Sequence, residues 1–118
     1  MTRTLIAIFT GLLLATGTAA SAGEREAEAL SRVAGGALLI DVRTPGEYAG
    51  GHLDGAINIP YPQVVTLLQQ QRVPTDRNIV VYCRSGNRSG IAQRLLQQAG
   101  YRDVFNGGAL QALQQQTR

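Results

Sequence analysis

Apolar and polar residues follow two alternating patterns along this chain from residue 24 onward. Short continuous apolar runs are typical of strands buried on both faces, and apolar residues three or four positions apart are typical of amphipathic helices. The runs predict strands at 37–40, 56–59, 79–82 and 104–105. The helical spacing predicts helices at 24–33, 62–71, 89–99 and 109–116. Glycine and proline predict a loop with a short helical turn at 45–51, and turns at 74–78 and 107–108.

This alternation of strands and helices predicts a single α/β domain, with a parallel sheet flanked by helices on both faces. In sheets of this kind, ligands bind beyond the carboxyl ends of the strands. The segment that follows the strand at 79–82 is therefore the candidate position of the ligand-binding or catalytic site.

The first 22 residues have a different pattern. Arg3 precedes an apolar stretch at 5–15, and the small residues Ala20-Ser21-Ala22 follow it. This order is typical of a secretory signal peptide, so we predict a signal peptide at 1–22 and a mature domain at 23–118. A membrane anchor is the alternative, but the apolar stretch is shorter than the about 20 residues that a spanning helix needs. We therefore expect an exported, periplasmic protein without stable membrane association after cleavage.

Charge and cysteine content narrow the function classes. Cleavage after residue 22 would leave ten arginines against eight acidic residues, a net charge of +2. This mild excess contains no basic run, so nucleic-acid binding is not expected. The sequence has one cysteine and one histidine and shows no cluster of metal ligands, so we predict no metal and no cofactor. A single cysteine also forms no internal disulfide, which raises the question of what the thiol does.

That cysteine, Cys83, directly follows the apolar run at 79–82, where a short polar loop leads into a helix. Gly86 is able to adopt a positive φ, so that successive loop N–H groups point inward and bind an anion. The helix N-terminus and the charges of Arg84 and Arg88 also favour the thiolate, which is the nucleophilic form. Cys83 is thus the candidate catalytic residue, and a buried structural thiol is the alternative. The candidate substrate-binding residues are Arg84, Ser85, Gly86, Asn87, Arg88 and Ser89.

This loop resembles the active-site loop of the rhodanese family, whose pattern is Cys-Arg-x-Gly-x-Arg. Two further segments resemble family signatures, and the resemblance extends from about residue 37 to residue 110. The first segment comprises Asp41-Val42-Arg43, Glu47-Tyr48 and residues 51–60. The second comprises Gly100-Tyr101, Val104 and Asn106-Gly107-Gly108. With the signal peptide, the chain is most similar to the single-domain periplasmic rhodaneses of the phage-shock type.

The resemblance implies a thiosulfate sulfurtransferase. A sulfane sulfur would pass from thiosulfate or a similar donor to a thiophilic acceptor, such as cyanide, a small thiol or a protein thiol. Cys83 would carry the sulfur as a persulfide, the amides of residues 84–89 would surround it, and Arg84 would attract the anionic substrate.

Three other functions remain open: a cysteine phosphatase, a sulfur carrier that delivers to another protein, and a degenerate domain used only for binding. The phosphatase loop has the pattern Cys-x5-Arg and is one residue longer than the loop here, in which Arg88 is the fifth residue after Cys83. Asp41, Arg43 and Glu47 are interpreted as a structural ion-pair network. His52 is also interpreted as structural, because sulfur transfer to a thiolate needs no general base.

Overall fold

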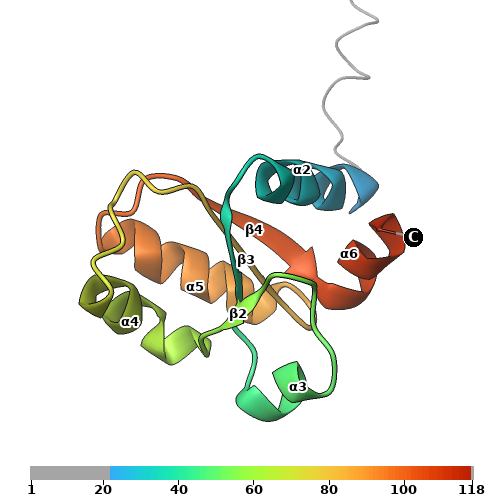
Figure 1. The fold of residues 1–118 in the computed structure, drawn as a ribbon, viewed down its shortest axis with the longest axis horizontal. Helices are drawn as coiled ribbons and strands as arrows, with labels where there is room; N and C mark the ends of the chain where they lie inside the picture. Colours follow the sequence, from blue (N-terminus) through green and yellow to red (C-terminus); the bar gives the residue numbers. More distant parts are fainter. Residues whose placement is uncertain (1–21, 118) are drawn as a thin grey trace, which may run out of the picture.

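A computed structural model describes residues 22–117 of the chain as a layered α/β arrangement (Figure 1). Residues 1–21, which form almost all of the predicted signal peptide, lie outside the described residues. The strands are β1 (Leu38–Asp41), β2 (Ile57–Asn58), β3 (Ile79–Cys83) and β4 (Val104–Ala109). The helices are α2 (Ala22–Ala34), α3 (Pro45–Ala49), the 3-10 helix η2 (Tyr61–Gln63), α4 (Val64–Gln70), α5 (Asn87–Gln98) and α6 (Leu110–Gln116).

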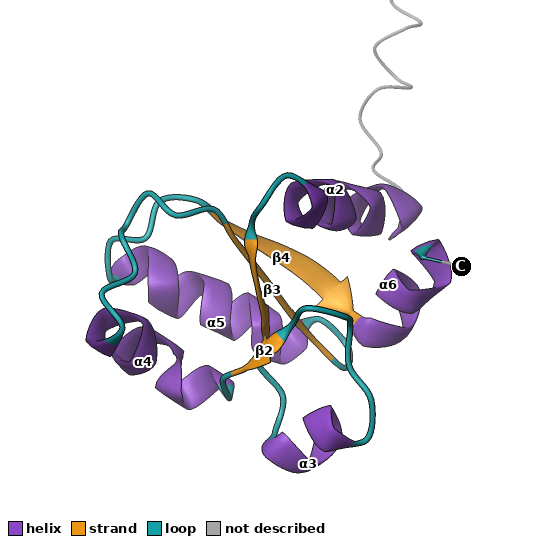
Figure 2. Cartoon of the chain, viewed as in Figure 1, coloured by secondary structure: helices purple, strands orange, loops and turns teal. Residues whose placement is uncertain are grey.

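The four strands form one sheet in the order β2-β1-β3-β4, and every pair is parallel (Figure 2). Helices α4 and α5 cover one face, and helices α2 and α6 cover the other. This arrangement confirms the predicted fold class. β3 lies inside the sheet and all five of its residues are buried, which is why this segment is apolar throughout.

Alternate residues of β3 belong to opposite layers of the core. Val80 and Tyr82 pack in the cluster beneath α2 and α6, whereas Val81 and Cys83 pack in the cluster beneath α4 and α5. This period of two is the ordinary geometry of a strand. It directs the Cys83 side chain towards α5, the helix whose first turn follows the loop.

The structure corrects the prediction for the last strand. Residues 107–108 were predicted to form a turn, but β4 continues through both glycines to Ala109. The register shifts here, because Val81 pairs with Asn106 while the next residue, Tyr82, pairs with Gly108. Helix α2 packs closely against the strand here, since a methyl group on Gly107 would lie 3.2 Å from the Ala29 Cβ atom.

Two smaller features also bear on the site. Helix α5 begins at Asn87, two residues before the predicted start, because Gly86 turns the chain with a φ of 96° and acts as its N-cap. None of the helices in the described part of the chain is long and apolar enough to cross a membrane.

Candidate functional site

Cys83 is the last residue of β3, and its side chain is completely buried. The chain then turns through residues 84–86 into α5, so the thiol lies beneath its own loop at the carboxyl edge of the sheet. Sequence reasoning placed the cysteine at this strand end. The catalytic role of Cys83 remains a prediction at this point.

Three groups of the following loop and helix contact the sulfur. The Gly86 amide donates to Cys83 Sγ at 2.9 Å, and the Ser89 amide lies at 3.4 Å. The Ser89 hydroxyl is a third partner, also at 3.4 Å. Burial raises the pKa of the Cys83 thiol, but hydrogen bonds from both groups of Ser89 and from the amides of Gly86 and Ser85 outweigh it. The net effect is a lowered pKa, which favours the nucleophilic thiolate.

Asn106 of β4 connects this loop to the edge strand. Its Oδ1 atom accepts from the Ser89 hydroxyl at 2.7 Å and from the Gly108 amide at 3.0 Å, and its Nδ2 atom donates to the Gly86 carbonyl at 3.2 Å. The Ser89 hydroxyl has one hydrogen, so Asn106 and the thiolate compete for it. Sequence reasoning missed this role, although Asn106 was part of a motif that carried the family resemblance.

Arg88 forms a bidentate ion pair with Glu47 of α3, with distances of 2.8 and 3.0 Å. This pair lowers the pKa of Glu47 to about 2 and raises that of Arg88. The sequence predicts that Glu47 pairs with Asp41 and Arg43. In the structure Glu47 pairs with Arg88 instead, because α3 places its carboxylate beside the start of α5. The charge of Arg88 near the site is therefore largely compensated.

The other two members of the expected network do form a pair. Arg43 donates to both carboxylate oxygens of Asp41 and to the Gly51 carbonyl, and both charged side chains are buried. The hydrogen bonds that Arg43 donates to Asp41 raise the pKa of Arg43. This buried pair joins the end of β1 to the loop that follows α3, so its geometry is that of a structural brace.

Arg84 differs from both of these arginines because it is exposed. Its side chain lines an open cavity of about 510 Å³ between the loop, α3 and α6. The lining residues of this cavity are Arg43, Glu47, Arg84, Leu110, Gln111 and Gln114. Ser85 and Asn87, the other predicted substrate-binding side chains, are also exposed on the loop.

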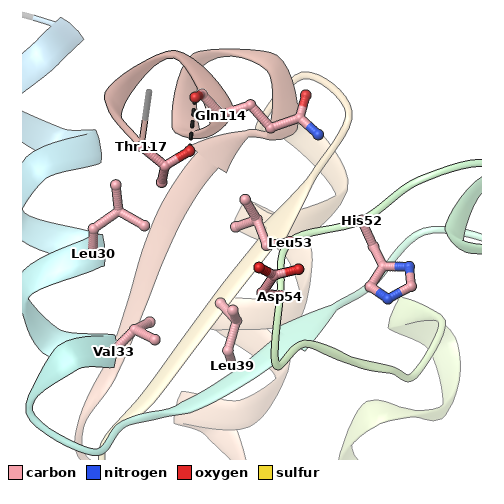
Figure 3. A pocket seen from close by; sticks show the side chains of 8 residues that line it. All are labelled: Leu30, Val33, Leu39, His52, Leu53, Asp54, Gln114 and Thr117. Carbon is pink, nitrogen blue, oxygen red and sulfur yellow. Dashed lines mark hydrogen bonds between the residues drawn. The ribbon is translucent and has the colours of Figure 1, made fainter.

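His52 lies elsewhere, in the loop between α3 and β2. Its ring stacks on Tyr48 at a centroid distance of 3.7 Å, and its Nδ1 atom lies 2.9 Å from the Tyr48 carbonyl oxygen. His52 is one of the residues that line a cavity of about 260 Å³ beside α2 and α6, and no residue of the Cys83 loop lines that cavity. Figure 3 shows the side chains around it. Within residues 22–117, no group of three or more His, Cys, Asp or Glu is placed to hold a metal ion.

Fold and site together define a class of protein: a parallel α/β domain with a cysteine at the end of a central strand, cradled by backbone amides. The Rhodanese-like domain family matches residues 25–110, and the chain belongs to this family. Sequence reasoning had reached the same family from the motifs.

Relatives and solved structures agree with this assignment. The thiosulfate sulfurtransferase PspE of Escherichia coli is 42% identical over 76 residues, which cover 60% of this chain and 68% of PspE. A sulfurtransferase of Allochromatium vinosum is 42% identical over 69 residues, covering 58% of this chain and 63% of that protein. Among solved structures, an Escherichia coli rhodanese with anions has a TM-score of 0.60 at 37% identity, covering 64% of this chain and 88% of its own.

Proposed function

We propose that this protein is a thiosulfate sulfurtransferase that carries a sulfane sulfur on Cys83. The observation that carries the proposal is the set of donors around Sγ: the Gly86 and Ser89 amides and the Ser89 hydroxyl. Such donors stabilise a negative charge on sulfur, first in the thiolate and then in the persulfide. Two relatives are named as sulfurtransferases, which supports the same chemistry.

The reaction has two steps that balance in atoms and charge. The Cys83 thiolate attacks the outer sulfur of thiosulfate, a new S–S bond forms, and sulfite leaves with the electron pair of the broken S–S bond. The acceptor, such as cyanide or a thiolate, then attacks the outer sulfur of the persulfide and releases the Cys83 thiolate. Neither step requires a general base, a metal or a cofactor.

We assign the remaining loop residues to binding. The amides of Arg84, Ser85, Gly86, Asn87, Arg88 and Ser89 surround the transferred sulfur. The exposed Arg84 side chain attracts the anionic donor. The cavity beside it admits the acceptor, which is cyanide, a small thiol or a thiol of a partner protein. A phosphatase is disfavoured because Arg88 is the fifth residue after Cys83, which leaves the loop one residue shorter than the Cys-x5-Arg pattern. We also propose that residues 1–22 direct export to the periplasm.

Intact mass tests the proposal directly. We expect the purified protein to gain one sulfur, about 32 Da, on incubation with thiosulfate and to lose it on addition of cyanide. Cys83→Ser should take up no sulfur while retaining the circular-dichroism spectrum of the wild type. Wild-type protein that is folded, carries a free thiol and gains no mass would refute the proposal, and phosphatase activity would then be assayed.

A further inference from the structure

The positive charges around the Cys83 loop divide into two groups. Arg43 and Arg88 are each committed to a carboxylate through two hydrogen bonds or more. Arg84 is exposed and has already been assigned to donor binding. A fourth arginine, Arg25 of α2, also reaches this edge of the sheet, although it lies 58 positions before Cys83 and outside every motif discussed above.

The Arg25 guanidinium lies over the two glycines of the site. A methyl group on Gly108 would lie 2.8 Å from Arg25 Nη2, and one on Gly86 would lie 3.8 Å from the same atom. Gly86 N is 2.9 Å from the sulfur. When the intervening bonds are added, the guanidinium lies within about 10 Å of Cys83 Sγ. Both glycines have positive φ angles. Neither has a side chain that would separate the Arg25 guanidinium from the loop.

Glu26 is the carboxylate that lies near Arg25. Arg25 Nε is 3.8 Å from Glu26 Oε2, a contact too long for a hydrogen bond, and the Glu26 side chain is buried. Within residues 22–117 this is the one ion pair that the structure gives Arg25, and 47% of its side chain is exposed. About half of the Arg25 side chain is therefore open to solvent, while its Nη2 atom lies beside both glycines of the site.

We propose that Arg25 is a specificity-determining residue that binds the sulfonate end of the sulfur donor while Cys83 attacks its outer sulfur. This inference rests on the proposed sulfurtransferase function. In that reaction the oxygens of thiosulfate point away from Cys83, and the charge of the leaving sulfite develops there. A guanidinium offers a planar pair of donors that matches such oxygens. Because the guanidinium lies within about 10 Å of Sγ, it is near enough to reach the sulfonate oxygens of a thiosulfate whose outer sulfur meets the thiolate.

The two half-reactions separate this role from a structural one. The sulfonate is present only when sulfur is taken up, so Arg25→Gln should lower kcat/KM for thiosulfate about three- to tenfold. The kcat/KM for cyanide, which reports the second half-reaction, should stay within about twofold of the wild type. The loss for thiosulfate should also shrink as ionic strength rises, because screening weakens the contribution of an exposed charge.

Arg72→Asn is the matched control. It also removes one exposed arginine, but Arg72 precedes β3 at the opposite end of the sheet. Asparagine suits its φ of 58° better than most residues do. Arg25→Lys retains a charge beside Glu26 without the planar pair of donors, so its kcat/KM for thiosulfate should lie between those of the wild type and Arg25→Gln. We expect Arg72→Asn to leave both half-reactions unchanged.

The outcomes distinguish this inference from the function on which it rests. If wild-type protein takes up sulfur and folded Arg25→Gln has an unchanged kcat/KM for thiosulfate, the role of Arg25 is refuted and the proposed function stands. An equal loss in both half-reactions also refutes it, since that result indicates a structural role. If wild-type protein takes up no sulfur from thiosulfate, both proposals are refuted.

Discussion

Ser89→Ala should raise the pKa of the Cys83 thiol by about half a unit to one unit. The substitution removes the hydroxyl 3.4 Å from Sγ but keeps the Ser89 amide and the Gly86 amide. A hydrogen bond to a charged group contributes about 1.5–3 kcal/mol. The hydroxyl hydrogen is shared with Asn106 at 2.7 Å, so we expect the thiolate to gain about 1 kcal/mol from it, and 1.36 kcal/mol corresponds to about one pKa unit.

The assay is the pH dependence of thiolate absorbance in the near ultraviolet, checked against the rate of alkylation by iodoacetamide. Ser85→Ala is the control, because Ser85 contributes its backbone amide to the lowered pKa and its side chain is exposed. The control should titrate like the wild type. An unchanged or lower pKa in folded Ser89→Ala would show that the hydroxyl donates to Asn106 alone, and the reasoning would fail.

Three further predictions concern stability. The pKa of Cys83 is lower in the folded chain than in the unfolded one, so the unfolded chain binds more protons between the two values. The Tm of the wild type relative to Cys83→Ser should therefore rise with pH up to about 8.5 and then level off, and calorimetry at several pH values measures this. Glu47 has a pKa of about 2 in the folded protein, so its ion pair with Arg88 should stabilise the fold fully above about pH 4.3 and should be lost as the pH falls towards 2. The free energy of unfolding in urea should therefore differ less between Glu47→Gln and the wild type at pH 3 than at pH 6. Asp41→Asn should cost about 3–5 kcal/mol in urea unfolding, because it leaves Arg43 buried without its counter-charge, and a cost below about 1 kcal/mol would contradict the role of this pair as a brace.

Local patterns were sufficient to predict most of the fold. The apolar run before Cys83 predicted β3 because a strand covered on both faces has no polar positions, and all of its residues are indeed buried. The prediction failed at β4, where Gly107-Gly108 resembles a turn when read alone. Whether a pair of glycines bends or extends depends on its neighbours, and here β3 pairs with the strand while Ala29 of α2 packs against Gly107.

The site shows the same division between local and distant information. The contacts of Gly86 and Ser89 with Cys83 span three and six positions, so the spacing of the loop was enough to place them near the sulfur. Glu47 contacts Arg88 across 41 positions, and Asn106 contacts Ser89 across 17. Such partners depend on how α3 and β4 dock against the loop, which no single stretch of sequence contains.

The register shift in β4 has a consequence for how this site responds to changes in chain length. β4 uses one residue more than β3 between the pairs Val81–Asn106 and Tyr82–Gly108. Deleting that residue would regularise the ladder while leaving the pairs Tyr82–Gly108 and Cys83–Ala109, and the faces to which these residues point, as they are. Gly108 would then directly follow Asn106, and its amide would leave the Asn106 Oδ1 atom that also accepts from the Ser89 hydroxyl. A single substitution keeps the extra residue in β4. A one-residue deletion would make the sheet more regular, but it would remove the contact between the Gly108 amide and Asn106.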